Sequence, residues 1–428
     1  MGKYKHEKEK LVTGKALGCC NEDCEILGIE HSHININLPA LMMEKKDEDC
    51  FVFPYKGKDY YFCKEAVKKV DDQLLTYWKY GIACTAVLLN APKLFDSRQE
   101  KALLKKVIHP DFEWDVQDAF ISAFPMESTE SKGYFEAFIA FLSNRYMSDK
   151  AEYGRLTGFI ISNEVNSQCV WGNAGSKPVE VYTKEYTEAV KAAFDVAREY
   201  WEYAQIYISL DHHWTEGFRP FDTNRCYGGK YVLDFVNKYA KEMGDFEWGV
   251  AYHPYPEALN YPDFYNDRIP TFYFDTRIIT FKNIEVLDAY LGQEEFLYKG
   301  KKRNIVFSEQ GFNARSKGFV EKQCAASYVL AYQKMKKLSE VQWMTHHAYL
   351  DNPHEFGLHL GIREVKADGS PGRKRPIYKV IRAMGTDEEQ KYVEWARKFI
   401  GKQLFDELLS PEIHCENEGD AKATDFGD

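Results

Sequence analysis

The chain has 428 residues, of which 44% are hydrophobic and 29% are charged, and its formal net charge is −10. This composition is typical of a globular protein and excludes fibrous and wholly disordered classes, and the acidic balance disfavours nucleic acid or an anionic membrane as a partner. No apolar run reaches the ~20 residues that a membrane-spanning helix needs, and the polar start MGKYKHEKEK shows no secretory signal. We therefore expect a cytoplasmic protein.

Short apolar runs alternate with amphipathic helical stretches from about residue 25 to about residue 385. The runs FVFPY and DYYF, separated by Lys56-Gly57-Lys58, predict a hairpin inserted after the first strand. We predict strands at 26–38, 82–90, 118–125, 155–166, 204–215, 247–256, 303–313 and 341–350. We predict helices at 64–80, 98–107, 133–147, 180–203, 229–243, 283–292, 320–338 and 378–384.

Eight apolar strands that alternate with helices predict an α/β fold, a closed parallel (β/α)8 TIM barrel. An open doubly wound sheet would normally carry a Gly-rich phosphate turn after its first strand, whereas His, Asn and Leu follow here. We expect a single domain with short extensions. Its parts are an N-terminal extension (1–24), the catalytic barrel (25–385), a C-terminal helix (386–410) and an acidic tail (411–428) that we expect to be disordered.

The ten cysteines are scattered, without a repeated spacing or a CxxC pair. Free and mostly buried thiols in a reducing cytoplasm are the simplest interpretation. The cluster Cys19, Cys20 and Cys24 leaves a metal knuckle open as an alternative, although no second half follows it.

Polar residues end one apolar strand after another. In a barrel of this kind the site lies at the C-terminal ends of the strands, so these residues are candidates for substrate binding. Aromatic residues make up 15% of the chain, which suits a site that stacks against the flat apolar faces of sugar rings. The candidates are His33, Asn37, Asn163, His212, His213, Trp214, His253, Tyr255, Trp343 and His347.

Two carboxylates stand out among the strand ends. Glu164 ends the run FIISNE on the fourth predicted strand, and Glu309 ends NIVFSE on the seventh. Cleavage of a glycosidic bond needs two carboxyl groups that flank it. One must be protonated to assist the leaving group, and the other must be ionised to attack or stabilise the oxocarbenium-like centre. We therefore take Glu164 and Glu309 as the catalytic pair.

The runs ISNEVN and FSEQGFN, with AYHPYP between them, resemble the clan A glycoside hydrolases, which are retaining (β/α)8 enzymes. The stretch 163–166 with Trp171 and Gly175 is also similar to the endo-galactanase branch. The span from about 25 to 385 looks like an uncharacterised domain family near this clan, with segments such as SLDHHW, AYHPYPE, KNIEVL and SEQGFN. The resemblance is long and is specific at the two Glu motifs, but it does not identify the sugar or the linkage.

The resemblance implies a hydrolase of carbohydrate metabolism that cleaves β-linked oligo- or polysaccharide without a cofactor or metal. It implies that Glu164 is the general acid/base, that Glu309 is the nucleophile and that Asn163 binds the sugar 2-hydroxyl. Tyr255 or His253 would hydrogen-bond Glu309, and Trp343 would form a platform under the reacting ring.

One departure from the clan concerns the end of strand two. Many members carry an Arg there that contacts the nucleophile, whereas this chain has Leu89-Asn90-Ala91. Asn37 or one of the histidines would have to take its place.

Two other classes of function remain open. The motif His31-Ser32-His33, with Glu164, His212 or His213, His253 and Asp351, is similar to the metal ligands of amidohydrolase barrels, which activate water on one or two ions. That interpretation leaves FSEQG without a role. A sugar-binding barrel without catalysis is the third possibility. The oligomeric state and the choice between exo and endo action cannot be predicted from the sequence.

Overall fold

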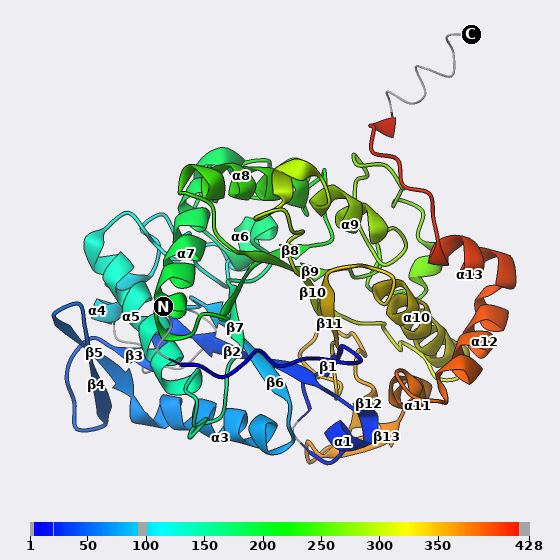
Figure 1. Cartoon of the computed structure of the whole chain (residues 1–428), viewed down its shortest axis with the longest axis horizontal. Coiled ribbons are helices and arrows are strands. Elements are labelled where there is room, and N and C mark those ends of the chain that lie inside the picture. The colour runs from blue at the N-terminus through cyan, green and yellow to red at the C-terminus, as the bar shows by residue number, and fades with distance from the viewer. Residues whose placement is uncertain (1–3, 20, 93–100, 419–428) are drawn as a thin grey trace, which may run out of the picture. The chain divides into compact units, whose positions relative to one another are not determined.

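The computed structural model describes residues 4–19, 21–92 and 101–418. Its central element is a closed parallel barrel with the strand order β1-β11-β10-β9-β8-β7-β6-β2, so the predicted (β/α)8 fold is confirmed (Figure 1). The barrel strands are β1 (Lys15–Leu17), β2 (His31–Asn37), β6 (Ala83–Leu89), β7 (Gly158–Ile161), β8 (Gln205–Asp211), β9 (Gly249–His253), β10 (Ile305–Gln310) and β11 (Val341–His346).

The barrel begins earlier than the sequence predicts. Strand β1 lies within the segment 1–24 that was predicted to be an extension, and it pairs with β11 and β2. Its three residues include Lys15, which is only 2% exposed and donates from Nζ to the carbonyls of Leu27 and Ile381. Burial lowers the pKa of Lys15 to about 8. Because β1 has only three residues and one of them is a lysine, it forms no apolar run that would predict a strand from the sequence.

The predicted strand 118–125 is wrong. Ser122 forms an isolated bridge with Asn173, and two successive N–H groups, those of Phe120 and Ile121, donate to the carbonyl of Val170. The loop after β7 therefore satisfies these polar groups, as buried backbone requires.

Because β1 replaces this segment in the count, Glu164 still follows the fourth barrel strand and Glu309 still lies on the seventh. The second strand is β2, which ends at Asn37 and not at Asn90.

The chain divides into two compact units, and each is described by itself. The first comprises Met1–Lys10, His33–Leu210 and Gly217–Ala251, and the second comprises Leu11–Ser32, Asp211–Glu216 and Tyr252–Asp428.

The first unit carries a small antiparallel sheet and the helices that follow β2, β6, β7 and β8. Its sheet has the order β3-β5-β4, and β4 and β5 form the predicted hairpin: Tyr55 pairs with Lys58, and Lys56 and Gly57 have φ of 46° and 80° as a tight two-residue turn requires. Figure 1 shows α5, α7 and α8 side by side. The elements are α2 (Leu38–Leu41), β3 (Met42–Met43), β4 (Cys50–Tyr55), β5 (Lys58–Cys63), α3 (Lys64–Lys79), α4 (Lys101–Val107), α5 (Thr129–Tyr146), a 3-10 turn η1 (Val165–Ser167), α6 (Gln168–Trp171), α7 (Val179–Tyr200) and α8 (Gly229–Glu242).

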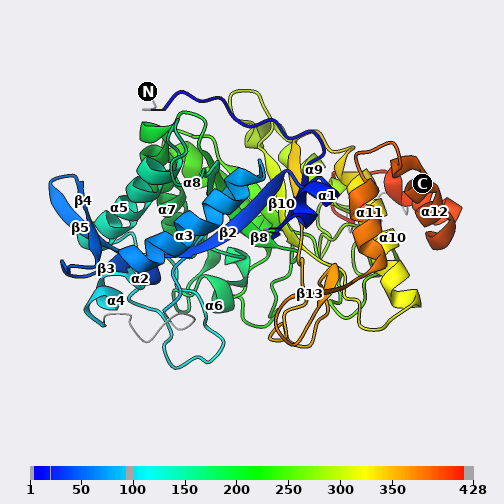
Figure 2. The same cartoon turned by 90° about the horizontal axis from the view of Figure 1, so that it is seen from below.

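The second unit is built around α10, which is buried along most of its length. Even Lys334 of α10 is fully buried, and its ammonium lies 2.9 Å from Glu285 Oε1. Helices α11, α12 and α13 pack on α10, and Figure 2 shows α10 and α11 side by side. The elements are α1 (Asp23–Leu27), η2 (Phe264–Asn266), α9 (Glu285–Leu291), η3 (Glu294–Phe296), α10 (Phe319–Met335), β12 (Arg363–Val365), β13 (Pro371–Lys374), α11 (Pro376–Ala383), α12 (Glu389–Ile400) and α13 (Lys402–Leu409).

A buried aspartate joins distant parts of the second unit. Asp23 accepts hydrogen bonds from the hydroxyls of Tyr378 and Tyr349 at 2.5 and 2.7 Å and from the guanidinium of Arg363 at 2.6 Å. Burial alone would raise the pKa of Asp23, but these three donors outweigh it and lower the pKa to about 2. The carboxylate of Asp23 therefore connects helix α1 with helix α11 and with the strand pair β12 and β13.

The C-terminal region departs in detail from the prediction of one helix over 386–410, since two helices, α12 and α13, occupy it. Of the predicted tail, residues 419–428 lie outside the described residues. The part before them is paired: the N–H of His414 donates to the carbonyl of Phe272, and the carbonyl of His414 accepts the N–H of Phe274. Among the described residues, no helix has the length and apolar character needed to cross a membrane.

Candidate active site

Glu164 lies in a tight turn directly after β7. Ser162 and Glu164 have φ of 64° and 40°, in the left-handed region that side chains avoid. The turn is held by Ser209 on β8, whose hydroxyl accepts the N–H of Glu164 at 2.9 Å. Tyr186 of α7 supports both strands, because its hydroxyl donates to Ile161 O at 2.7 Å and accepts the N–H of Ser209 at 3.3 Å. Strained backbone that is fixed in this way is concentrated at functional sites.

The segment that follows Glu164 is fastened to the loop after β8. Tyr227 donates from its N–H to Asn166 O, and Cys169 donates to Arg225 O, both at 2.7 Å. A disulfide joins Cys169 to Cys226, whose Cα atoms are 5.9 Å apart. The backbone around Glu164 is therefore anchored on both sides within the first unit.

The disulfide corrects the expectation that all cysteines are free. Sequence spacing gave no signal for it, because the partners are 57 residues apart and belong to no motif. Cys20 lies outside the described residues. The free cysteines are Cys19, Cys24, Cys50, Cys63, Cys84, Cys324 and Cys415.

Glu309 lies on β10 in the second unit and accepts a hydrogen bond from Tyr255. The Tyr255 hydroxyl is 2.8 Å from Glu309 Oε1, and Tyr255 itself is largely buried. His253, the other predicted partner of Glu309, pairs through Nε2 with the hydroxyl of Ser308 at 3.0 Å. The hydrogen bond from Tyr255 therefore orients the carboxylate of Glu309.

Two of the predicted substrate-binding residues, Trp214 and Trp343, are buried in this structure. Trp214 is fully buried, and its indole N–H donates to Phe274 O at 2.8 Å. Trp343 is only 2% exposed, and its ring stacks on His31 with 3.7 Å between centroids. Both indoles therefore pack the interior of the second unit. The exposure of a side chain depends on tertiary packing, so the local sequence around a Trp near a strand end does not predict whether it is buried.

The two histidines after β8 are both partly exposed, and their rings stack on each other. Burial lowers the pKa of His212 to about 4, which makes its ring neutral. His213 is partly exposed, stacks on His212 and places Nδ1 3.0 Å from Asp211 Oδ1. His213 is therefore oriented by a carboxylate, whereas the ring of His212 is held by stacking on His213.

The remaining predicted residues also differ in their surroundings. Asn37 is committed to the backbone, because it donates to Ala91 O at 3.1 Å and accepts the N–H of Ala91 at 2.8 Å. That pair joins the end of β2 to the chain after β6. His33 on β2 and Asn163 after β7 are partly exposed. His347 follows β11 and lies beside Glu355, at 3.4 Å between Nε2 and Oε1.

Three residues that the sequence did not single out contact the predicted ones. Ser209, Ser308 and Glu355 bond or pair with Glu164, His253 and His347. The two serines lie inside runs that already contained candidates, SLDHHW and SEQGFN, so their position within three residues of a candidate was the available signal. Glu355 lies in a loop and belongs to no pattern.

The histidines of the metal-dependent alternative have other partners. His31 stacks on Trp343, His253 pairs with Ser308, and the carboxylate of Asp351 is 2.7 Å from the guanidinium of Arg375. Within residues 4–19, 21–92 and 101–418, no group of three His, Cys, Asp or Glu side chains is arranged to hold a metal ion.

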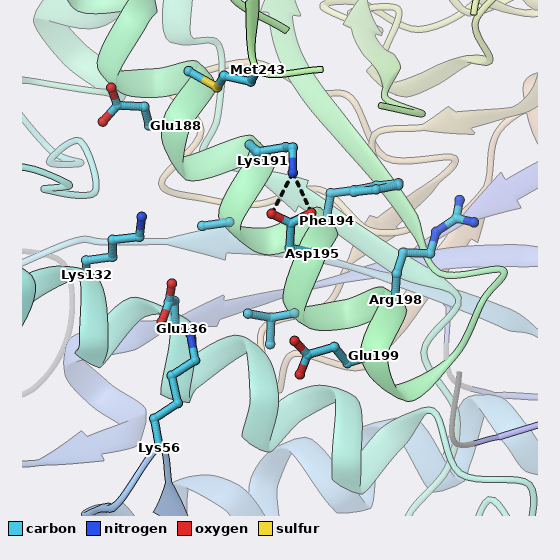
Figure 3. Close-up of a pocket in the computed structure, with 12 residues that line it drawn as sticks. Lys56, Lys132, Glu136, Glu188, Lys191, Phe194, Asp195, Arg198, Glu199 and Met243 are labelled. Atoms are coloured by element: carbon cyan, nitrogen blue, oxygen red, sulfur yellow. Dashed lines mark hydrogen bonds and ion pairs between the residues drawn. The ribbon is translucent and has the colours of Figure 1, made fainter. Parts of the chain in front are cut away.

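A polar hollow of about 620 Å³ lies on the first unit and is lined mainly by α5 and α7 (Figure 3). Its charges are largely paired: Lys56 lies 2.8 Å from Glu136, and Lys191 contacts both carboxylate oxygens of Asp195 at 2.6 Å. None of its lining residues is a predicted site residue, and it is a feature of the helical layer.

The barrel, with one glutamate after its fourth strand and another on its seventh, has the architecture of a broad class of (β/α)8 proteins that place their sites at the strand ends. The chain belongs to a family described as a family of unknown function (DUF5722), which it matches over residues 8–408. No curated protein sequence matches it.

Solved structures with a similar fold include two β-glucosidases. The β-glucosidase from Pyrococcus furiosus is 13% identical, with a TM-score of 0.53, and the match covers 90% of this chain and 86% of that one. A family 1 β-glucosidase from Thermotoga maritima is 15% identical, with a TM-score of 0.51 and coverages of 87% and 86%. At these identities the likeness shows the fold alone.

A third similar structure is a family 39 glycoside hydrolase from Bacteroides cellulosilyticus WH2. It is 15% identical, with a TM-score of 0.47, and the match covers 86% of this chain but 60% of that protein's length.

Proposed function

We propose that the chain is a retaining glycoside hydrolase that cleaves β-linked oligo- or polysaccharides, with Glu164 as the general acid/base and Glu309 as the nucleophile. The observation that carries the proposal is the hydrogen bond from Tyr255 to Glu309 on the seventh barrel strand. The strained and anchored turn at Glu164 after the fourth strand supports it. The glycosidase names of the proteins with a similar fold are consistent with it.

The mechanism follows from the two environments. Glu309, oriented by the Tyr255 hydroxyl, attacks the anomeric carbon while Glu164 protonates the leaving oxygen. Water, deprotonated by Glu164, then hydrolyses the glycosyl ester on Glu309. Asn163, next to Glu164, is proposed to bind the sugar 2-hydroxyl. The reaction needs no cofactor and no metal, because proton transfer and covalent bonding use the two Glu side chains.

The test is turnover of a panel of nitrophenyl β-glycosides of glucose, galactose, mannose and xylose. We expect at least one to be hydrolysed, with the β-anomer of the sugar released first, as nuclear magnetic resonance would show. Release of the α-anomer first would contradict retention. A structure of a sugar complex should place the carboxyl groups of Glu164 and Glu309 ~5–5.5 Å apart, and a separation above ~6.5 Å would favour inversion.

The two other functions predict different results. A metal-dependent amidohydrolase would require His31 and His253 to leave Trp343 and Ser308 in order to bind an ion. Its activity would be removed by a chelator and restored by the metal. A sugar-binding barrel would bind a glycan and leave every glycoside of the panel intact. Turnover of the same panel tests the identity of the sugar and the linkage. Sedimentation analysis tests the oligomeric state.

A further inference from the structure

A pocket of about 370 Å³, which we call the basic pocket, lies between α11 and α12 in the second unit. Its volume is within the range of ~300–1,000 Å³ that small-molecule sites occupy. One wall is the end of β13 with the start of α11, and the other is a face of α12; Figure 1 shows α11 between β13 and α12. No described acidic residue lines it, whereas five cationic and two aromatic residues do: Arg373, Lys374, Arg375, Lys379, Lys391, Tyr392 and Trp395.

The two arginines of the basic pocket are held by carboxylates that do not line it. Arg375 is only 5% exposed, and its two Nη atoms donate to the two carboxylate oxygens of Asp351 at 2.8 and 2.7 Å. Arg373 donates to Glu321 and, at 2.7 Å, to Glu364. These bonds fix the guanidinium groups in place, so little side-chain order has to be gained when a ligand binds.

The lysines of the basic pocket leave positive charge that is not balanced. Lys379 of α11 and Lys391 of α12 are exposed, and neither forms an ion pair with any residue that the structure describes. Lys374 is 43% exposed and lies 3.4 Å from Asp23, a single carboxylate that cannot use all three of its N–H donors. The pocket therefore offers free N–H donors and positive charge to an anion, although the net charge of the whole chain is −10.

Two aromatic rings of α12 lie beside these charges. Tyr392 and Trp395 are three residues apart on the helix, and both are partly exposed. The ammonium of Lys391 lies 5.5 Å from the centre of the Tyr392 ring, and the Trp395 ring stacks on Phe399 with 5.5 Å between centroids. Phe399 therefore supports the Trp395 ring. A supported and partly exposed indole suits the flat apolar face of a sugar ring, whereas the lysines suit an acidic substituent on it.

From these residues we infer that the basic pocket is a second saccharide site, which binds a sugar unit that carries a carboxylate, sulfate or phosphate group. Lys379 and Lys391 bind the acidic group, and Trp395 stacks on the ring. The inference deepens the proposed function and rests on it, because it makes the substrate an acidic glycan. Helix α11 follows the last barrel strand, so its first turn lies at the end of the barrel where Glu309 lies.

Isothermal titration calorimetry on the full chain tests this site directly. The probes are an oligogalacturonide, a sulfated carrageenan oligosaccharide and mannose 6-phosphate, which separate the three acidic groups, and a neutral cello-oligosaccharide. We expect at least one acidic probe to bind with a Kd below about 1 mM at low salt, and at least about 10-fold more tightly than the neutral one. Its affinity should fall as salt is added, because exposed charges are screened.

Variants assign that binding to the basic pocket. The double variant Lys379→Gln with Lys391→Gln should weaken binding of the acidic probe by about 10-fold, and it should fold like the wild type because both side chains are exposed. Trp395→Ala should weaken the acidic saccharide but not inorganic sulfate, which has no ring to stack. The matched control is Lys299→Gln, which removes a lysine that lies 5.0 Å from the Tyr298 ring outside the pocket and should leave binding unchanged.

Three results would overturn the inference. The first is that no acidic probe binds more tightly than the cello-oligosaccharide. The second is that the double lysine variant binds the acidic probe as the wild type does. The third is that inorganic sulfate or adenosine triphosphate binds as tightly as the acidic saccharide, which would make the pocket a general anion site or a nucleotide site.

Binding and turnover separate the inference from the proposed function. If acidic saccharides bind through Lys379 and Lys391 while no glycoside, neutral or acidic, is turned over, the proposed function fails and the pocket stands as a saccharide-binding site. If glycosides are turned over with retention while the double lysine variant binds every probe as the wild type does, the inference alone fails.

Discussion

Glu164 occupies a backbone position that favours glycine, with φ of 40° and ψ of 52°. A side chain in this left-handed region costs roughly 1–2 kcal/mol, so the protein holds a glutamate where it is unfavourable for stability. The strain is consistent with a residue that is retained for its chemistry rather than for packing. The N–H bond to Ser209 is what fixes the turn in this conformation.

Replacing Glu164 by glycine and by alanine separates strain from chemistry. We expect Glu164→Gly to be more stable than Glu164→Ala by about 1 kcal/mol, measured by urea denaturation, because only glycine accepts this φ without cost. Both variants should lose activity on poor leaving groups far more than on activated aryl glycosides, and azide should rescue both with formation of a β-glycosyl azide. Equal stability of the two variants would contradict the argument from strain.

At the scale of elements, the segment after Glu164 depends on the disulfide to the loop after β8. Closing a loop between residues 57 apart in sequence stabilises a protein by roughly 4 kcal/mol in the chain-entropy estimate. Cys226→Ser should therefore lower the free energy of unfolding by about 2–4 kcal/mol. Added reductant should destabilise the wild type to the same level and leave the variant unchanged.

The control for this prediction is Cys415→Ser, which alters an exposed free thiol and should have no effect. If reductant does not change the free energy of unfolding of the wild type, the disulfide does not contribute to stability.

Elements differ in how well the sequence predicts them. Seven barrel strands show as apolar runs because they are buried on both faces. The hairpin β4–β5 shows through its Lys56-Gly57 turn. Strand β1 does not show, because it has three residues and its Lys15 is satisfied by carbonyls from other elements. The segment 118–125 is apolar because it is buried, but its hydrogen bonds go to a loop, and apolar runs do not distinguish the two cases.

The same distinction applies to the candidate site. The placement of Glu164 and Glu309 at strand ends could be predicted from strand order. The family resemblance implied that Tyr255 or His253 bonds Glu309, and the structure shows the bond from Tyr255. The burial of Trp214 and Trp343 could not, since it depends on which segments cover them. Glu355 was missed for the same reason: it reaches His347 through the path of a loop.

At the scale of the whole molecule, Asp267 makes stability depend on pH. Burial raises the pKa of Asp267 to about 7, although Thr280 donates to its carboxylate at 2.8 Å. The folded state therefore prefers the protonated form, whereas the unfolded chain ionises near pH 4. It follows that the free energy of unfolding falls as pH rises from about 4 to about 7, by roughly 4 kcal/mol at most.

Asp267→Asn tests this dependence, because asparagine can still accept from Thr280 and cannot ionise. The variant should be more stable than the wild type at pH 8 and nearly equal to it at pH 4, as measured by thermal unfolding at both values. A difference in stability that does not change with pH would rule out titration of Asp267 as its cause.

The contacts of Asp23 also set an order of events during synthesis. Its partner Tyr378 is 355 residues further along the chain. At ribosomal rates of ~5–20 residues per second, these two residues are made tens of seconds apart. Strand β1 and helix α1 leave the ribosome first, yet they reach their final neighbours only after α11 has emerged. Closure of the barrel is therefore a late step, and until β11 has emerged β1 lacks one of its two neighbouring strands.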